Sequence, residues 1–116
     1  MEDFFGLTKN LCVFTGRIVG EPQFVPVGEG EVAFMTLKTY VREPQANGQW
    51  VDVEQLVPLM VTDKNKVEVV RKYVKDGKQL QIEAYYKAWE VDGAVQHALS
   101  VRSMDLGANK YIPKNE

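Results

Sequence analysis

Cysteine and histidine are almost missing from this sequence. It holds one cysteine, Cys12, and one histidine, His97, among 116 residues. One thiol cannot form a disulfide framework, and one thiol with one imidazole cannot supply the ligands of a structural zinc site. Cys12 lies in an apolar run, which favours a buried, unreactive thiol. His97 falls on the apolar row of its predicted strand, which favours a packed, hydrogen-bonded side chain. We expect no metal site.

Motifs that carry catalysis are missing as well. No nucleophile and base stand at a recognised elbow, and no glycine-rich loop has the pattern that cradles phosphate. The acidic pair Glu29 and Glu31 lies in a glycine loop, and we interpret it as solubilising charge. We therefore predict a protein that is not an enzyme and that needs no cofactor.

The chain also lacks long apolar runs. No stretch approaches the ~20 apolar residues that a membrane-spanning helix needs. The first ten residues, MEDFFGLTKN, begin acidic and hold only a short apolar patch, unlike a signal peptide. These absences predict a soluble protein of a reducing compartment, the cytoplasm, with no membrane partner.

Positive charge is not in excess. Lysine and arginine number 14 against 16 aspartate and glutamate residues, which gives a formal net charge of -2. A protein with this balance does not find nucleic acid by bulk positive charge. A nucleic-acid-binding function therefore requires local clusters of basic residues and help from stacking aromatic side chains.

What remains is the composition of an ordinary globular protein. Hydrophobic residues make up 45% and charged residues 26% of the chain, and a chain of this length can bury a core without metals or disulfides. We divide it into a leader at residues 1–9, one folded domain at 10–107 and a polar tail at 108–116. Phe4 and Phe5 in the leader are expected to pack on the body or on a partner chain.

Alternation of apolar and polar residues predicts five strands. Three cover residues 10–19, 31–40 and 50–61, and a hairpin with an Asp92-Gly93 turn occupies residues 78–102. In 31–40 either row fits the core, and the row of Ala33, Met35, Leu37 and Thr39 is the more uniformly apolar. The other predicted core rows are Val51, Val53, Val57 and Leu59, then Leu80, Ile82, Ala84 and Tyr86, then Val95, His97, Leu99 and Val101.

Two residues mark irregular strands. Gly16 stands in the middle of the first run, where a glycine indicates a bulge or a sharp coil. Pro58 cannot donate a ladder hydrogen bond, so the third run should be an edge strand or bulged near that point.

One segment changes to helical spacing. Val67, Val70 and Val74 are three and four residues apart within 62–74, Thr62 or Asp63 can cap the start, and Gly77 ends the run. The order is therefore three strands, one helix and two strands. It predicts an all-β, five-stranded Greek-key barrel with one α-helix between strands 3 and 4, the oligonucleotide/oligosaccharide-binding fold or OB-fold. An open sandwich of the same strands is the alternative.

The outward rows of these strands carry aromatic and basic side chains. Stacking on a base is worth ~1–3 kcal/mol per base and tolerates any sequence, and contacts to phosphate weaken as salt rises. Asp52 and Glu54 share this face and would repel a phosphate backbone. The candidate nucleic-acid-binding residues on these rows are Trp89, Trp50, Tyr40 and Tyr85 for stacking, with Lys38, Arg42, Lys87 and Arg102 for phosphate.

The order and spacing of these segments resemble the bacterial and phage single-stranded DNA-binding proteins (SSB). The matching pieces are NLCVFTGRIVGEPQF, VAFMTLKT, and YVKDGK followed by LQIEA, with Trp89 before a turn. The resemblance spans residues 10–107. Trp89 matches a tryptophan of the family's fourth-strand hairpin, Met60 stands where the family has a stacking phenylalanine, and Glu54 falls where it has a tryptophan. Trp50, on the same face, is the substitute for that tryptophan. A further tryptophan of the family falls near Glu43, and Tyr40, three residues earlier, is its substitute. The resemblance thus adds Met60 to the stacking candidates.

The resemblance implies a protein that coats single-stranded DNA without strong sequence preference in replication, recombination and repair. It implies a homo-oligomer, a tetramer or a dimer, in a bacterial cytoplasm on the nucleoid, encoded by the host or by a phage. Replication proteins are further partners in the family, recruited by an acidic C-terminal tip. This sequence ends YIPKNE, without such a tip; either this member has none, as in a phage or plasmid version, or the sequence stops short of it.

A second interpretation stays open. The same fold could serve as a protein-interaction module or a primosome-type adaptor, in which the outward aromatics and Asp52 and Glu54 contact protein. The basic residues near the helix are likewise open to two interpretations, a solvated face or a secondary phosphate track; they are Lys64, Lys66, Arg71, Lys72 and Lys75.

Overall fold

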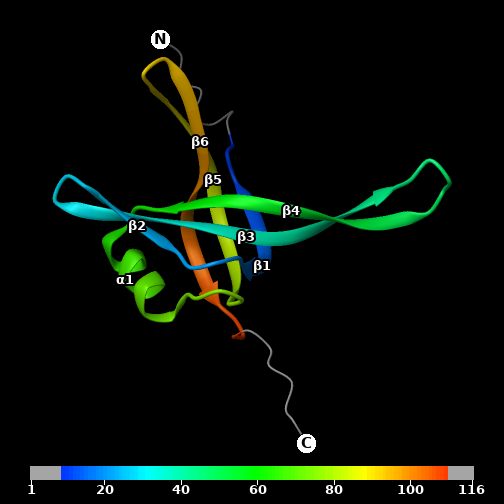
Figure 1. Cartoon of the computed structure of the whole chain (residues 1–116), viewed down its shortest axis with the longest axis horizontal. Helices are drawn as coiled ribbons and strands as arrows, with labels where there is room; N and C mark the ends of the chain where they lie inside the picture. The colour runs from blue at the N-terminus through cyan, green and yellow to red at the C-terminus, as the bar shows by residue number, and fades with distance from the viewer. Residues whose placement is uncertain (1–8, 110–116) are drawn as a thin grey trace, which may run out of the picture.

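Within residues 9–109, the part of the chain that the computed structural model describes, six strands and one helix form a small barrel with two long hairpin arms (Figure 1). The elements are β1 (Cys12–Ile18), β2 (Gln23–Val27), β3 (Gly30–Pro44), β4 (Trp50–Val61), α1 (Lys64–Tyr73), β5 (Gln79–Val91) and β6 (Ala94–Leu106). The predicted packing of Phe4 and Phe5 falls outside this range.

The strands close into a ring. Hydrogen-bonded neighbours follow the order β1-β5-β6-β4-β3-β2, and β1 also pairs with β3. That last pairing makes β1, β5, β6, β4 and β3 a closed barrel, with β2 attached to β3 on the outside. β4 and β6 run parallel where Leu59 meets Leu99. This topology confirms the predicted Greek-key OB-fold, and closure of the ring excludes an open sandwich.

Gly16 stands where β1 changes its partner. Residues 12–17 of β1 pair with β5, whereas Arg17 and Ile18 pair with β3. A Cβ atom at Gly16 would collide with the backbone carbonyl oxygen of Lys38. Glycine at this position therefore lets the backbones of β1 and β3 approach closely enough to close the barrel. This explains why a glycine stands in the middle of the strand.

The helix lies between the third and fourth barrel strands, as predicted. The short strand β2 precedes β3 and lies outside the ring, so in the numbering of the structure α1 follows β4. Asp63 is the N-cap: its Oδ1 accepts hydrogen bonds from the backbone nitrogens of Asn65 and Lys66 at 2.9 and 3.1 Å. The hydrogen bond from Lys66 lowers the pKa of Asp63.

Apolar rows from three long strands and the helix fill the barrel. The row of β3 that faces inward is the more uniformly apolar one, and the helix adds its valines at the spacing that the sequence predicts. The central buried residues are Ala33, Met35, Leu37, Val57, Leu59, Val61, Val67, Val70, Val74, Leu80, Ile82 and Ala84.

A β-bulge in β6 keeps its apolar side chains on the face of the sheet that packs on this core. Glu83 pairs with Ser103 but Ala84 pairs with Val101, so Arg102 is an extra residue on β6. The shift places Leu99 and Val101 before the bulge, and Met104 after it, on the same face of the sheet. A bulge turns the strand locally and redirects its side chains, which leaves Arg102 exposed.

Both hairpins continue past the barrel as arms, and the predicted core rows fail there. Tyr86 is 49% exposed and Val51 40% exposed, and His97 is exposed as well. The rings of Tyr86 and His97 meet edge to face, with their centres 6.0 Å apart. The backbone of β1 pairs with β5 no further than Ala84, so beyond that point no third strand covers the β5–β6 hairpin. The prediction of a packed His97 is therefore wrong.

Two further side chains differ from expectation. Met60 lies in the expected outer row, directly opposite Phe34 of β3 and Ser100 of β6, but these neighbours on both sides leave it only 8% exposed. Cys12, expected to be buried, is half-buried. The expectation for Pro58 is confirmed, because β4 gains β6 as a second neighbour only from Leu59 onward and is an edge strand before it.

Candidate nucleic-acid interface

A groove of about 320 Å³ lies where the β5–β6 arm leaves the barrel. Its floor is the outer row of β3 and the adjoining part of β4, and one wall is the arm. The chain between β1 and β2 supplies the opposite wall. The lining residues are Val19, Glu21, Gln23, Phe34, Met35, Thr36, Pro58, Leu59, Trp89, Gln96, His97 and Ala98.

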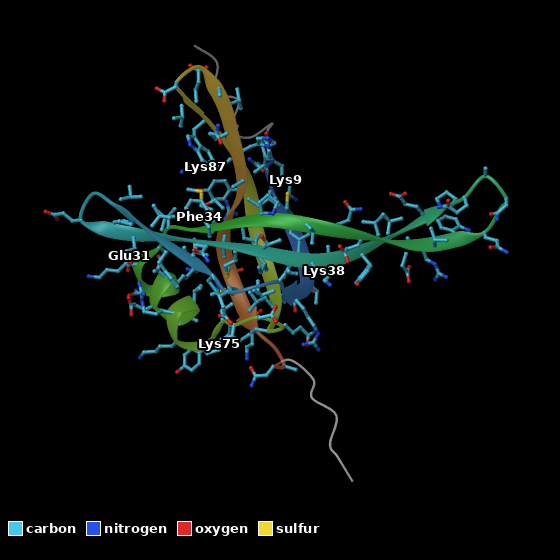
Figure 2. The ribbon with its side chains drawn as sticks, in the orientation of Figure 1. Lys9, Glu31, Phe34, Lys38, Lys75 and Lys87 are labelled. Carbon is cyan, nitrogen blue, oxygen red and sulfur yellow. The ribbon has the colours of Figure 1, made fainter. Side chains whose placement is uncertain are left out.

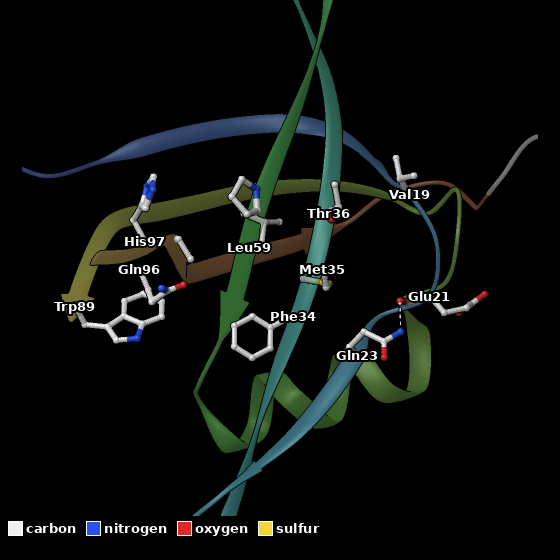
Figure 3. Close-up of a pocket in the computed structure, with 12 residues that line it drawn as sticks. Val19, Glu21, Gln23, Phe34, Met35, Thr36, Leu59, Trp89, Gln96 and His97 are labelled. Atoms are coloured by element: carbon white, nitrogen blue, oxygen red, sulfur yellow. Dashed lines mark hydrogen bonds between the residues drawn. The ribbon is translucent and has the colours of Figure 1, made fainter. Parts of the chain in front are cut away.

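Two aromatic rings line this groove from different elements. Phe34 comes from β3 and is half-buried, and Trp89 comes from β5 in the arm and is also half-buried. Figure 3 shows the Phe34 ring between Trp89 on one side and Gln23 on the other. Each ring keeps part of its surface accessible; Phe34 is carried by the barrel sheet, and Trp89 by the paired strands of the β5–β6 arm. Partly exposed rings on a rigid sheet are the arrangement that base stacking uses.

The arm places a row of candidate residues beside the groove. Tyr85, Lys87 and Trp89 alternate along β5 on one face, opposite Ser100, Ala98 and Gln96 of β6. The bulge residue Arg102 lies with its guanidinium carbon 5.8 Å from the centre of the Tyr85 ring. Figure 2 shows Lys87 on the arm, two residues before Trp89 on the same face of β5. Four predicted site residues therefore lie together on this arm.

The other predicted residues follow the outer row of the β3–β4 hairpin. Lys38, Tyr40 and Arg42 alternate along β3, and Tyr40 is 59% exposed. Trp50 lies opposite Pro44 at the far end of the arm, ten positions along β3 from Phe34. At ~3.3 Å per residue this separation is about 33 Å. Trp50 therefore belongs to the same face as the groove but not to the groove itself.

Carboxylates accompany the basic residues of this second arm. Glu54 lies opposite Tyr40, and its Oε1 is 3.7 Å from the Nζ of Lys38. Asp52 lies directly opposite Arg42 in the register of the two strands. The acidic residues that the sequence placed on the presumed binding face are thus on it, interleaved with the basic ones.

The sequence reasoning missed Phe34. The sequence leaves open which row of 31–40 faces the core, and nothing in the row of Phe34 indicates that the β5–β6 arm stands over it. Gln23 and Gln96 were also missed; their amides line the groove and can donate to and accept from base edges. The signal for Phe34 was a large aromatic residue on an outward row.

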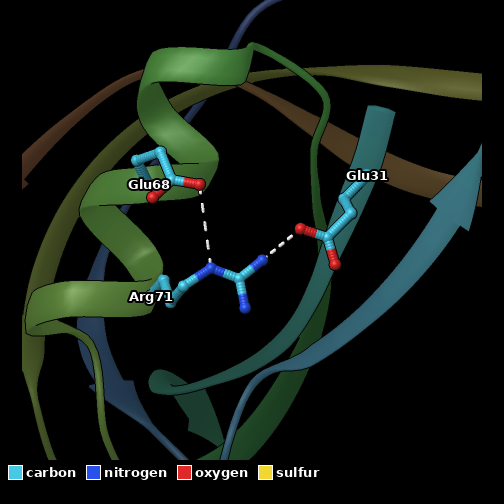
Figure 4. A network of polar contacts seen from close by, with 3 residues as sticks. All are labelled: Glu31, Glu68 and Arg71. Atoms are coloured by element: carbon cyan, nitrogen blue, oxygen red, sulfur yellow. Dashed lines mark hydrogen bonds and ion pairs between the residues drawn. The ribbon is translucent and has the colours of Figure 1, made fainter. Parts of the chain in front are cut away.

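The basic residues of α1 contribute little to this surface. Figure 4 shows Arg71 between Glu31 and Glu68, both of which it pairs with, and its guanidinium carbon lies 4.2 Å from the centre of the Phe24 ring. These contacts tie the helix to β2 and β3. Arg71 therefore has a structural role, whereas Lys64, Lys72 and Lys75 are exposed.

Within residues 9–109 no group of three or more histidine, cysteine, aspartate or glutamate side chains is placed to hold a metal ion. In the same range no helix is long and apolar enough to cross a membrane.

Solved structures of single-stranded DNA-binding proteins match this architecture. A Plasmodium falciparum SSB solved in complex with ssDNA superposes with a TM-score of 0.73 at 16% identity, over 87% of this chain and 96% of that one. The chain has the SSB fold. A deletion mutant of the Thermus aquaticus protein gives a TM-score of 0.74 at 16% identity, over 86% of this chain and 51% of that one.

The mitochondrial single-stranded DNA-binding protein Rim1 from S. cerevisiae matches with a TM-score of 0.66 at 16% identity, over 88% of this chain and 97% of that one. No protein-family model and no curated protein sequence matches the chain. The likeness is therefore one of fold at low identity, and it agrees with the resemblance that the sequence segments indicate.

Proposed function

We propose that this protein binds and coats single-stranded DNA without strong sequence preference and is not an enzyme. The observation that carries the proposal is the groove in which Phe34 and Trp89 present their rings beside Lys87. Stacking on such rings accepts any base, because every base has a π-face. Lys87 and Arg102 supply phosphate contacts from the same arm.

The proposed cellular role follows from coating. We place the protein in DNA replication, recombination and repair, in a bacterial cytoplasm on the nucleoid, as a host or phage product. We also propose a homo-oligomer, a dimer or a tetramer. Exposed apolar residues on the uncovered faces of both arms support it, among them Val41, Val51 and Val95, since a second copy could cover them.

Tryptophan fluorescence during titration with oligo(dT) tests the proposal. The sequence has two tryptophans, so Trp50→Phe leaves only Trp89 and Trp89→Phe leaves only Trp50. We expect saturable quenching that weakens as salt rises, and the larger share of it in the Trp50→Phe variant, since Trp89 lies in the groove. Absence of quenching at low salt in the wild type would overturn the proposal.

A protein-interaction or primosome-type adaptor is the second candidate. The observation that favours it is the pair of carboxylates, Asp52 and Glu54, on the same face as Tyr40 and Trp50, where a purely phosphate-binding surface would have none. An apolar interface with protein keeps its affinity as salt rises, whereas DNA binding loses it. The oligo(dT) titration separates the two candidates, because a surface that contacts only protein gives no quenching with oligo(dT) even at low salt.

A further inference from the structure

Basic residues on the two arms differ in their pairing. On the β3–β4 arm, Lys38 is held by Glu54 at 3.7 Å, and the two side chains are 38% and 52% exposed. On the β5–β6 arm, no carboxylate of residues 9–109 forms an ion pair with Lys87 or Arg102. A phosphate group can therefore reach Lys87 and Arg102 directly. To reach Lys38 it must compete with the carboxylate of Glu54.

The position of Glu54 makes this competition local. Glu54 and Lys38 lie on neighbouring strands in one outward row, and Tyr40 lies directly opposite Glu54. A nucleotide stacked on Tyr40 would bring its phosphate within reach of both charges. The carboxylate would repel that phosphate while it occupies the ammonium that would otherwise attract it.

We propose that Glu54 competes with DNA for Lys38 and so holds the β3–β4 arm in a weakly binding state. This inference rests on the proposed single-stranded DNA binding. The groove and the β5–β6 arm bind the DNA strand first, because Lys87 and Arg102 have no ion-pair partner there among the described residues. Lys38 joins only when a phosphate displaces Glu54, and so the arm adds little affinity and releases the strand readily.

Substitution of Glu54 gives a measurable gain. An exposed ion pair contributes up to ~1 kcal/mol, so we expect Glu54→Gln to tighten binding of oligo(dT) by about fivefold at low salt. Because a freed Lys38 adds one phosphate contact, the slope of log K against log salt should become steeper by about 0.7. Glu29→Gln is the control with the same charge change; Glu29 lies in the exposed turn between β2 and β3, far from Lys38 along β3.

The decisive comparison repeats Glu54→Gln in a Lys38→Gln background. If Glu54 acts through Lys38, the gain is present in the wild-type background and absent in the Lys38→Gln background. An equal gain in both backgrounds would show that Glu54 simply repels DNA, and it would overturn the inference. A gain with Glu29→Gln as large as with Glu54→Gln would overturn it too, since net charge would then explain both.

Titration of the wild-type protein with oligo(dT) distinguishes a failure of this inference from a failure of the proposed single-stranded DNA binding. If the wild-type protein does not bind oligo(dT), the proposed function fails and this inference fails with it. If the wild type binds with salt-dependent quenching and Glu54→Gln behaves identically, only the competition is refuted.

Discussion

Replacement of Phe34 tests the groove most directly. Phe34 is half-buried on β3, opposite Met60 of β4 and Gln23 of β2, and its free surface lines the groove with Trp89. One stacked base contributes ~1–3 kcal/mol. We therefore expect Phe34→Ala to weaken binding of oligo(dT) by about 2 kcal/mol, which is roughly 30-fold.

Leucine at the same position separates stacking from packing. Phe34→Leu keeps an apolar side chain against Met60 but removes the π-face, so we expect most of the loss in affinity with little change in the melting temperature. Phe34→Trp keeps a ring and should retain binding. The assay is quenching of tryptophan fluorescence for Phe34→Ala and Phe34→Leu, and fluorescence anisotropy of a labelled oligo(dT) of about 16 nucleotides for all three variants.

The result that would refute this reasoning is a Phe34→Leu protein that is folded and binds with wild-type affinity. Phe34 would then be a packing residue of the β3–β4 sheet, and Trp89 would stack without a partner ring across the groove. A loss of affinity in Phe34→Ala alone would not rescue the prediction, because removal of the half-buried ring also loosens the floor of the groove.

Three further predictions follow from the charges and the backbone. Gly16→Ala should destabilise the barrel by about 1–3 kcal/mol in chemical denaturation, since its Cβ meets the Lys38 carbonyl; wild-type stability would contradict this. Lys87→Gln should make the salt slope of oligo(dT) binding shallower by about 0.7, and an unchanged slope would remove Lys87 from the phosphate path. The lowered pKa of Asp63 means that its stabilisation is present above the unfolded-state pKa and is lost as pH falls through the folded-state pKa. Asp63→Asn still caps the helix but does not titrate, so its thermal unfolding should lose less stability than the wild type on acidification; parallel losses would contradict the assignment.

The barrel could be predicted because its evidence is local. Alternation with period two identified the inward row of Ala33, Met35 and Leu37, and the switch to a spacing of three and four identified Val67 and Val70. The resemblance to single-stranded DNA-binding proteins then agreed with the observed order of strands. These features depend only on residues that are close together in the sequence, so the pattern of apolar residues is enough to predict them.

The arms could not be predicted in the same way. Alternation continues through Tyr86 and His97, but the row is a core only where a third strand covers it, and that depends on where pairing with β1 ends. Met60 is buried for the converse reason, since β6, far along the chain, pairs beside it. The groove at Phe34 likewise exists only because the β5–β6 arm leaves the barrel over that residue. Non-local pairing decided each of these cases.

The charge balance and the arms together explain how a chain with a net charge of -2 can be suited to nucleic acid. A net positive charge, which would add long-range attraction over the whole molecule, is absent, so in the proposed function short-range contacts supply most of the free energy of binding. The structure concentrates these in one place: accessible rings from two elements, Phe34 and Trp89, with Lys87 on the same arm as Trp89. Elsewhere on the same face Glu54 offsets Lys38. We therefore expect stacking to contribute more to the free energy of binding than phosphate contacts do. Such a surface accepts any base but does not attract every polyanion.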